Sequence, residues 1–294
     1  MQNKSHHCCP HLGVPENQTE ALAMGNLQIK AWQFACETFE IHSGSPCTLP
    51  KHFHDTYQIA FTTRQPGEYI CDKKTWFAPP GNIIIFHPGE IHSTVGQSMR
   101  RQQDASRLIY VDENRLTDIA SGVAPQASIP PVFDKRVITD KRLISRFIRM
   151  HALSGTHAAR LEKESELLLL LSDLLASNAA NLPTTPSFQR NRPKAMLVQD
   201  YLRTHYRDNI SLETLSQLTH TSPYHLNRLF SREFGMPPHA FQTQVRVEHA
   251  KRMLLRGESV AATAASAGFY DQSHLARHFK RIVGVSPQTY SAGA

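Results

Sequence analysis

Two stretches of sequence decide the fold of the C-terminal third: Ser222–Pro238, SPYHLNRLFSREFGMPP, and Asp271–Pro287, DQSHLARHFKRIVGVSP. Aligned at an offset of 49 residues, they agree at seven of their seventeen positions. Each begins with a residue that caps helix N-termini, Ser222 or Asp271, and each contains a glycine of the kind that ends a helix. The repeat therefore indicates one helical unit that the chain uses twice.

Each copy is predicted to be the second helix of a helix-turn-helix. Its apolar residues recur at helical spacing and form a core-facing stripe. A shorter predicted helix, Ser211–Leu218 or Val260–Ala267, and a turn come before it. In a helix-turn-helix the second helix enters the major groove of DNA. A helical hairpin without DNA binding is the structural alternative, but the presence of two copies favours DNA binding.

The distribution of charge supports the same interpretation. The 294 residues include 32 Lys and Arg against 25 Asp and Glu, a formal net charge of +7. Residues 190–294 hold 14 of the basic and 7 of the acidic residues, so the net charge of residues 1–189 is zero. A basic module joined to a neutral one is typical of a protein that binds a polyanion with one of its parts.

The polar faces of the two copies carry groups that can recognise bases. Arg can bond guanine, and Asn and Gln can bond adenine. The predicted helix His239–Leu255 between the copies would be a rod of about 26 Å, which can place both faces on one side of a duplex. We expect double-stranded DNA as the partner. The predicted DNA-binding residues are Tyr224, Asn227, Arg228, Ser231, Gln272, Ser273, Ala276, Arg277 and Lys280.

The N-terminal part of the chain is predicted to be an antiparallel β-structure. From Leu27 to Asp112, short apolar runs such as Tyr57–Phe61 alternate with turns that contain Gly and Pro, a pattern typical of a barrel or sandwich. Two helices, Val137–Leu153 and Glu162–Leu175, are expected to follow. The second is leucine-rich on several faces, so we expect it to pack on the barrel, on a partner subunit in a homodimer, or on both.

These patterns predict an α+β protein with two domains. We expect a disordered tail over residues 1–25, a barrel over 26–133, a helical packing or dimerisation segment over 134–180, a linker over 181–193 and an all-α DNA-binding domain over 194–294. The tail holds His6-His7-Cys8-Cys9 without a second cluster to complete a metal site, and the cysteines are expected to be reduced thiols. Neither a secretory signal nor the ~20-residue apolar run of a membrane helix is found. The sequence therefore predicts a cytoplasmic, nucleoid-associated protein.

The second copy belongs to a longer run with a family resemblance. Gly268–Arg281, continued by Gly284-Val285-Ser286-Pro287, closely resembles the signature of the AraC/XylS family of bacterial transcription regulators. Leu226–Phe234, followed by Gly235, resembles the first helix-turn-helix of that family. The resemblance covers about residues 194–294 and implies a seven-helix DNA-binding domain with two such motifs joined by a helix. It also implies a sequence-specific regulator, an activator, that works with RNA polymerase.

The N-terminal half resembles the cupin-like effector domain of the same family. The matching sequence is His52-Phe53-His54-Asp55-Thr56-Tyr57-Gln58, then Pro88-Gly89-Glu90-Ile91-His92. Metal-binding cupins have a carboxylate where this chain has Gln58, a poorer ligand for the metals that imidazole binds. A metal-free pocket for a small-molecule effector is therefore favoured over a metal site at His52, His54 and His92. The predicted effector-binding residues are His52, His54, Tyr57, Gln58 and His92.

The main interpretation is an effector-responsive transcription regulator without catalytic residues or a cofactor. The alternative is a metal-dependent cupin enzyme, such as an oxygenase or isomerase, tethered to a DNA-binding domain, and Gln58 counts against it. A third hypothesis, a constitutive architectural DNA-binding protein, does not explain why the larger, neutral part of the chain has the pattern of a barrel.

Overall fold

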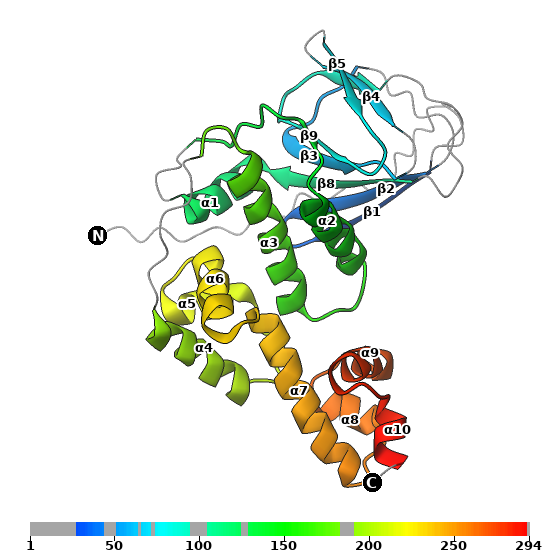
Figure 1. Cartoon of the computed structure of the whole chain (residues 1–294), viewed down its shortest axis with the longest axis vertical. Helices are drawn as coiled ribbons and strands as arrows, with labels where there is room; N and C mark the ends of the chain where they lie inside the picture. Colours follow the sequence, from blue (N-terminus) through cyan, green and yellow to red (C-terminus); the bar gives the residue numbers. More distant parts are fainter. Residues whose placement is uncertain are drawn as a thin grey trace, which may run out of the picture. The chain divides into compact units, whose positions relative to one another are not determined.

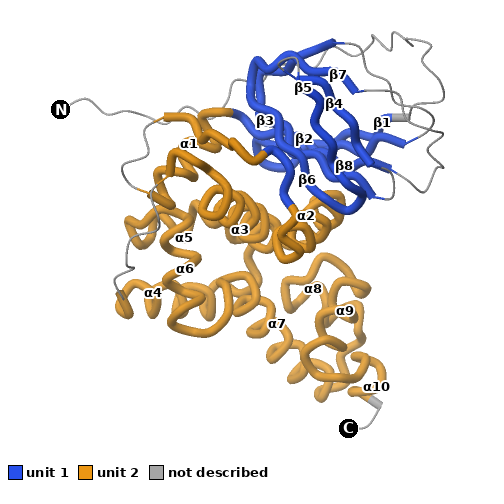
Figure 2. The backbone as a smooth tube through the Cα atoms, turned by 45° about the horizontal axis from the view of Figure 1, so that its top comes forward, with its two compact units in different colours: residues 1–112, 136–138 blue, residues 113–135, 139–294 orange. Residues whose placement is uncertain are grey.

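The computed structural model describes residues 28–43, 51–63, 66–71, 74–94, 105–124, 129–182 and 191–292. They belong to two compact units (Figure 2). Unit 1 runs to Asp112 and also contains Arg136–Ile138, whereas unit 2 contains Glu113–Lys135 and the chain from Thr139 onward. The predicted disordered tail lies outside the described residues, as do residues 183–190 of the predicted linker.

Unit 1 contains two antiparallel sheets (Figure 1). One has six strands in the order β1-β2-β8-β3-β6-β9, and the other has three in the order β5-β4-β7. The strands are β1 (Gln28–Phe34), β2 (Glu37–Ser43), β3 (Thr56–Phe61), β4 (Gly67–Cys71), β5 (Lys74–Ala78), β6 (Ile83–Phe86), β7 (His92–Thr94), β8 (Ser106–Asp112) and β9 (Val137–Ile138).

The predicted antiparallel β-fold is confirmed, but the strands form two open sheets and not a closed barrel. The core lies where the sheets face each other. It joins Tyr69 and Cys71 of β4 to Ala60, Phe86 and Leu108 of the six-stranded sheet. An isolated bridge connects the backbones of His52 and His92 through two N–H···O bonds of 2.9 Å. Two predicted pocket residues are thereby held next to each other.

The helix predicted over Val137–Leu153 begins later than expected. Val137 and Ile138 form β9, which pairs with Ile84 and Ile83 at the edge of the six-stranded sheet. Helix α2 (Lys141–Ser154) starts after Asp140, whose carboxylate accepts the N–H of Arg142 at 2.8 Å. The predicted start was wrong because helical periodicity does not reveal that the β-branched residues Val137 and Ile138 pair with another strand.

Unit 2 is helical in its described residues (Figure 1). Helix α1, inside the segment predicted as barrel, was not expected. The helices are α1 (Glu113–Val123), α2, α3 (Arg160–Asn178), α4 (Arg192–Thr204), α5 (Leu212–Thr219), α6 (Pro223–Phe234), α7 (Pro238–Leu255), α8 (Val260–Ser266), α9 (Gln272–Val283) and α10 (Pro287–Ala292). The segment α4–α10 provides the seven helices that the resemblance implies.

Both helix-turn-helix units have the predicted caps. The Ser222 hydroxyl accepts the N–H of His225 at the start of α6, and the Asp271 carboxylate accepts the N–H of His274 at the start of α9. Both helices end at a glycine in the left-handed conformation, where L side chains are strained. The predicted repeat is therefore a repeat of structure.

Helix α3 is buried on several faces, as its leucines predicted. It packs against α1 and α2 and also against α5, α6 and α7 of the DNA-binding segment. Its leucines Leu167, Leu168, Leu170, Leu171, Leu174 and Leu175 are all buried within this chain. Of the packing arrangements that the sequence left open, intrachain packing therefore accounts for these side chains. Within the described ranges, no helix is long and apolar enough to cross a membrane.

Candidate nucleic-acid interface and effector pocket

Helix α9 presents its predicted DNA-binding face to solvent. Gln272, Ser273, Arg277 and Lys280 are exposed, and Ala276 is half-buried. The opposite face carries Leu275 and Phe279 into a core that α7 and α8 complete. The exposed face thus offers an amide, an arginine and a lysine on a helix whose orientation is fixed by its apolar side.

Helix α6 has the equivalent face largely covered. Tyr224 is 6% exposed and Asn227 is 1% exposed, while Arg228 and Ser231 are half-buried. The Arg228 guanidinium donates to the Tyr224 hydroxyl at 2.6 Å and lies over its ring, 5.5 Å from the centroid. Neither amide atom of Asn227 has a hydrogen-bond partner among the residues that the structure describes. A buried amide in this state is costly.

Helices α1 and α3 pack against α6 (Figure 1). The contact with α1 is close at Gly122, where an added Cβ would lie 3.3 Å from Tyr224 Cβ and 3.6 Å from the Ser222 hydroxyl. On the α3 side, Asp173 interacts electrostatically with Arg228. As a result, the predicted DNA-binding face of α6 is largely covered in this arrangement.

A carboxylate of α3 also holds the first helix of the same motif. Glu164 accepts the N–H of Leu212, at the start of α5, at 2.7 Å. Near the start of α3, the N–H of Arg160 is donated to the Asn209 side chain at 3.3 Å. A helix N-terminus is a favourable place for an anion, and here a glutamate of the same chain occupies it.

The helix that joins the two motifs is anchored to the loop after α4. Arg246 of α7 is buried and donates to the carbonyl groups of Tyr206 at 2.6 Å and Asp208 at 2.9 Å. Gln242, one turn earlier, donates to the same two carbonyls. Burial lowers the pKa of Arg246 to about 10, so the side chain keeps its charge at neutral pH.

In unit 1 the structure brings together four of the five predicted effector-binding residues. The rings of His52 and His54 lie 4.4 Å and 5.0 Å from the ring of His92, centroid to centroid. His54 Nε2 lies 2.7 Å from Gln58 Oε1. Burial lowers the pKa of His92 to about 4, so this ring is neutral at pH 7 and its Nδ1–H can donate to the Glu90 carbonyl.

Tyr57 does not join this group. Consecutive residues of a strand point to opposite faces, and Tyr57 contacts the His87 ring, with centroids 5.7 Å apart, while its neighbour Gln58 contacts His54. Two aromatic residues that the sequence did not single out take part instead. Phe86 stacks on His92 with centroids 4.1 Å apart, and Tyr110 contacts His54. Both are register partners of Gln58, a relation that only the strand order reveals.

A partly buried ion pair supports the loop before His92. Glu90 accepts from Arg136, with one N–H···O distance of 2.5 Å, and from the backbone of His87 at 2.9 Å. Burial raises the pKa of Glu90, but the bonds from Arg136 and His87 outweigh it, so the net pKa lies well below its ordinary value. Arg136 also lies over the Trp76 ring.

Comparison with known proteins gives two family matches. A family model described as "AraC-like ligand binding domain" matches residues 47–171, and one described as "Helix-turn-helix domain" matches residues 215–293. The first contains the histidine group of unit 1, and the second contains α6 and α9. The two matches therefore fall on the two sites described above.

Similar proteins with these domains are known over most of the chain. A Bacillus subtilis protein named "Uncharacterized HTH-type transcriptional regulator YbfI" is 29% identical over 264 residues, which cover 88% of this chain and 90% of that protein. The arabinose operon regulatory protein of Escherichia coli is 24% identical over 248 residues, 81% of this chain and 80% of its own length. The crystal structure of a probable AraC family regulator from Rhodopseudomonas palustris is 30% identical, covers 35% of this chain and 97% of its own, and has a TM-score of 0.33.

Proposed function

Because the chain belongs to the AraC family of transcription regulators, we propose that it binds its operator with both helix-turn-helix units and that an effector in unit 1 controls this binding. The chain is a regulator with a DNA-binding part and a ligand-binding part.

The proposed DNA contacts come from α6 and α9. Arg228 and Arg277 occupy equivalent positions of the repeat and are proposed to bond guanine, while Asn227 and Gln272 are proposed to bond adenine. Lys280 is proposed to contact phosphate. The remaining predicted contacts are Tyr224, Ser231, Ser273 and Ala276. Helix α7 spans 18 residues, about 27 Å, a length that suits two adjacent segments of the major groove.

The burial of Asn227 is the observation that carries the proposed control. A residue suited to read a base, with both amide atoms unpartnered among the described residues and 1% exposure, cannot reach DNA while it is covered. Helices α1 and α3 pack against α6 from outside the predicted DNA-binding domain, so we infer that they form the removable part of the cover. We infer that the covered arrangement has low operator affinity and that an uncovered one binds. An effector acts by preferring one of the two arrangements.

The chain provides a direct connection from the effector pocket to this cover. Tyr110, beside the histidine group, lies on β8, and β8 ends at Asp112, directly before α1 begins at Glu113. Helix α1 carries Gly122, which contacts Tyr224. A ligand that moves Tyr110 would therefore act on the start of the helix that covers α6.

The proposed effector is a small molecule that forms hydrogen bonds. His52, His54, His92 and Gln58 offer nitrogen and oxygen groups, and Phe86 and Tyr110 provide aromatic walls. No catalytic step is assigned to these residues. Activation of transcription through RNA polymerase is a further expectation that the resemblance supports. A homodimer formed through the segment Val137–Leu175 and a location at the nucleoid stay expectations from the sequence.

The test combines operator mapping with binding measurements. Genome-wide mapping of bound sites supplies the operator, and fluorescence anisotropy then measures the affinity of the full chain for it with and without candidate effectors. A ligand of the pocket should change operator affinity, and Tyr110→Phe or Gln58→Leu should reduce that change. Absence of operator binding would refute the assignment of α6 and α9. Operator binding that no pocket ligand alters would refute the control.

A further inference from the structure

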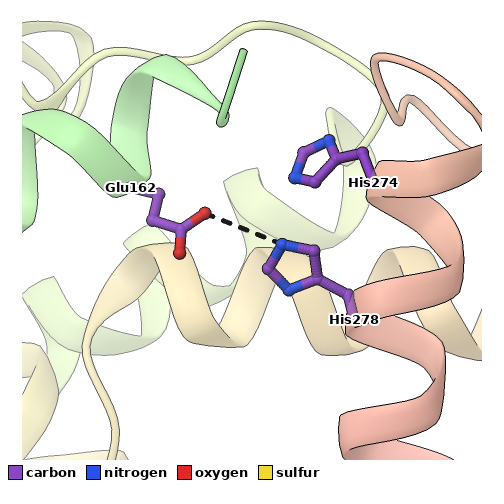
Figure 3. A group of neighbouring side chains, drawn as sticks. All are labelled: Glu162, His274 and His278. Atoms are coloured by element: carbon purple, nitrogen blue, oxygen red, sulfur yellow. Dashed lines mark ion pairs between the residues drawn. The ribbon is translucent and has the colours of Figure 1, made fainter. Parts of the chain in front are cut away.

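Three ionisable side chains outside the proposed DNA contacts and the effector pocket meet between α3 and α9. Glu162 comes from α3, and His274 and His278 come from successive turns of α9 (Figure 3). One ligand atom of each lies within 4.8 Å of the others, and His278 Nε2 is 3.8 Å from Glu162 Oε2. Both imidazole rings point toward the Glu162 carboxylate.

This group is buried and incompletely bonded. The three residues are 5%, 7% and 2% exposed, in chain order. Glu162 Oε2 and His278 Nε2 have no hydrogen-bond partner within the described residues. Buried polar atoms are nearly always satisfied by protein, water or an ion, so a group between the carboxylate and the two rings would account for both atoms.

The protonation states suit a metal ion. Burial lowers the pKa of His274 to about 4, and burial together with the neighbouring His274 lowers the pKa of His278 to about 3. Both rings are therefore neutral at pH 7, as a metal ligand must be. Burial raises the pKa of Glu162 above its ordinary value, although nearby arginines oppose the shift, and a bound cation would favour its carboxylate form.

From this geometry we propose that Glu162, His274 and His278 form a site for a divalent ion of the zinc class, with water as the fourth ligand. Two imidazoles and one carboxylate are a ligand set of open zinc sites, and histidines four residues apart on a helix reach one ion. Tetrahedral zinc at about 2.1 Å from its ligands separates them by roughly 3.4 Å. The 3.8 Å distance between His278 and Glu162 has to close by a few tenths of an ångström. The separations to His274, which are within 4.8 Å, have to close by up to about 1.4 Å.

Metal binding changes the hydrogen bonds at the far side of each ring. With the ion on Nε2, the ring proton moves to Nδ1, which then needs an acceptor. At present Nδ1 of His278 faces the Arg281 guanidinium at 2.9 Å, and Nδ1 of His274 faces the N–H of Tyr270 at 3.3 Å. Arg281 is exposed and can turn into solvent. The ion and Arg281 therefore compete for His278.

The consequence for regulation rests on the proposed function. Helix α3 covers α6, so an ion that joins α3 to α9 adds a bond that exists only while the two helices are together. Zinc is then expected to lower the operator affinity of the wild type. The largest possible fold-change is the ratio of the zinc affinities of the covered and uncovered arrangements. Metal binding itself needs no DNA, so its test is independent of the proposed function.

The experiment measures zinc bound to the chelator-treated full chain by equilibrium dialysis, with cobalt absorption as a reporter of tetrahedral nitrogen and oxygen coordination. Because histidines elsewhere in the chain can also bind metal, the decisive quantity is the difference between variants. The variants Glu162→Gln, His274→Gln and His278→Asn should each lose one equivalent of bound zinc or bind that zinc at least tenfold more weakly. The matched control is His220→Asn, because His220 is an exposed histidine of unit 2 in the left-handed conformation that asparagine tolerates; this variant should bind zinc as the wild type does.

A second arm uses the competition with Arg281. Arg281→Gln replaces a donor by a side chain that can accept the Nδ1 proton of His278, and outer-shell partners change metal affinity by about 10–100-fold, so this variant should bind zinc more tightly. Circular dichroism establishes that each variant is folded. Equal zinc stoichiometry and affinity in the wild type and the three ligand variants would overturn the proposal. Unchanged or weaker binding by Arg281→Gln would overturn the assignment of the ring nitrogens.

Discussion

The contact between Gly122 and Tyr224 allows the cover on α6 to be loosened without replacing a proposed DNA contact. In Gly122→Leu, the Cβ alone would lie 3.3 Å from Tyr224 Cβ, and the rest of the side chain has to push α1 and α6 apart. Overpacking of this kind costs about 1–3 kcal/mol. The cost falls on the covered arrangement, because no such contact exists once α1 has left α6.

The expected result is tighter operator binding. A penalty of about 1–3 kcal/mol on the covered arrangement raises the apparent affinity by roughly 5- to 150-fold while that arrangement predominates. Fluorescence anisotropy on the mapped operator measures the change. Gly122→Ala adds only one carbon and should give a smaller increase. Asp118→Leu, at an exposed position of α1, should change affinity by no more than about twofold.

The double variant Gly122→Leu/Asn227→Ala separates uncovering from any general effect. If the gain depends on α6 reaching DNA, loss of the Asn227 amide should remove much of it. Affinity of a folded Gly122→Leu protein that equals the wild-type value, or a gain that Asn227→Ala leaves intact, would refute the inference that α1 hides a base-reading face.

Three further predictions concern other parts of the molecule. Arg277→Ala should weaken operator binding by about 1–3 kcal/mol and relax the preference at one base pair. Lys280→Ala should weaken binding to all sequences alike and reduce the salt dependence of binding, as measured by anisotropy. If Arg277→Ala also weakens binding to all sequences equally, Arg277 contacts phosphate and not a base. Gly268 has φ +81°, and an added Cβ would lie 2.7 Å from the Arg207 backbone. Gly268→Ala should therefore lower the free energy of unfolding in chemical denaturation by about 1–3 kcal/mol. Gly257→Ala, where φ is +82° but the space is open, should lower it less, and the reverse order would contradict the close approach at Gly268. The pKa of Glu90 is lower in the folded state than its ordinary 4.5, so the stability that this carboxylate contributes is present above pH 4.5 and is lost as the pH falls toward the folded pKa. The difference in melting temperature between the wild type and Glu90→Gln should therefore shrink on acidification. A constant difference would argue against the ion pair.

The features that the sequence predicted best are those determined within a few residues. Ser222 and Asp271 mark helix starts because their side chains accept nearby backbone N–H groups, and Gly235 and Gly284 mark helix ends because of their conformation. These signals placed α6 and α9 almost to the residue. The same local logic identified α3, whose leucines are spread around the helix.

What the sequence did not predict depends on contacts between distant segments. Tyr224 and Asn227 were expected on an open face, but both are buried, and nothing in the sequence of α1 indicates that Gly122 meets Tyr224. Phe86 and Tyr110 join the histidine group of the proposed effector pocket only because β3 pairs with both β6 and β8. Periodicity along one strand cannot reveal which strands become its neighbours.

The proposed metal site falls between these two cases. The spacing of His274 and His278 is visible in the sequence, but two histidines on one helix are common without a metal. Glu162 completes the group from a helix far away in the chain, so the third ligand is supplied by tertiary packing alone.

The passage of Arg136–Ile138 back into unit 1 means that no single cut divides this protein into two intact pieces. A fragment that stops at Asp112 loses β9 and leaves Glu90 without its guanidinium partner. A fragment that stops after Ile138 keeps both but carries α1 without the helices that it packs against. Exchange of sensing modules between relatives at one junction would therefore always leave an exposed apolar face or an unpaired strand edge.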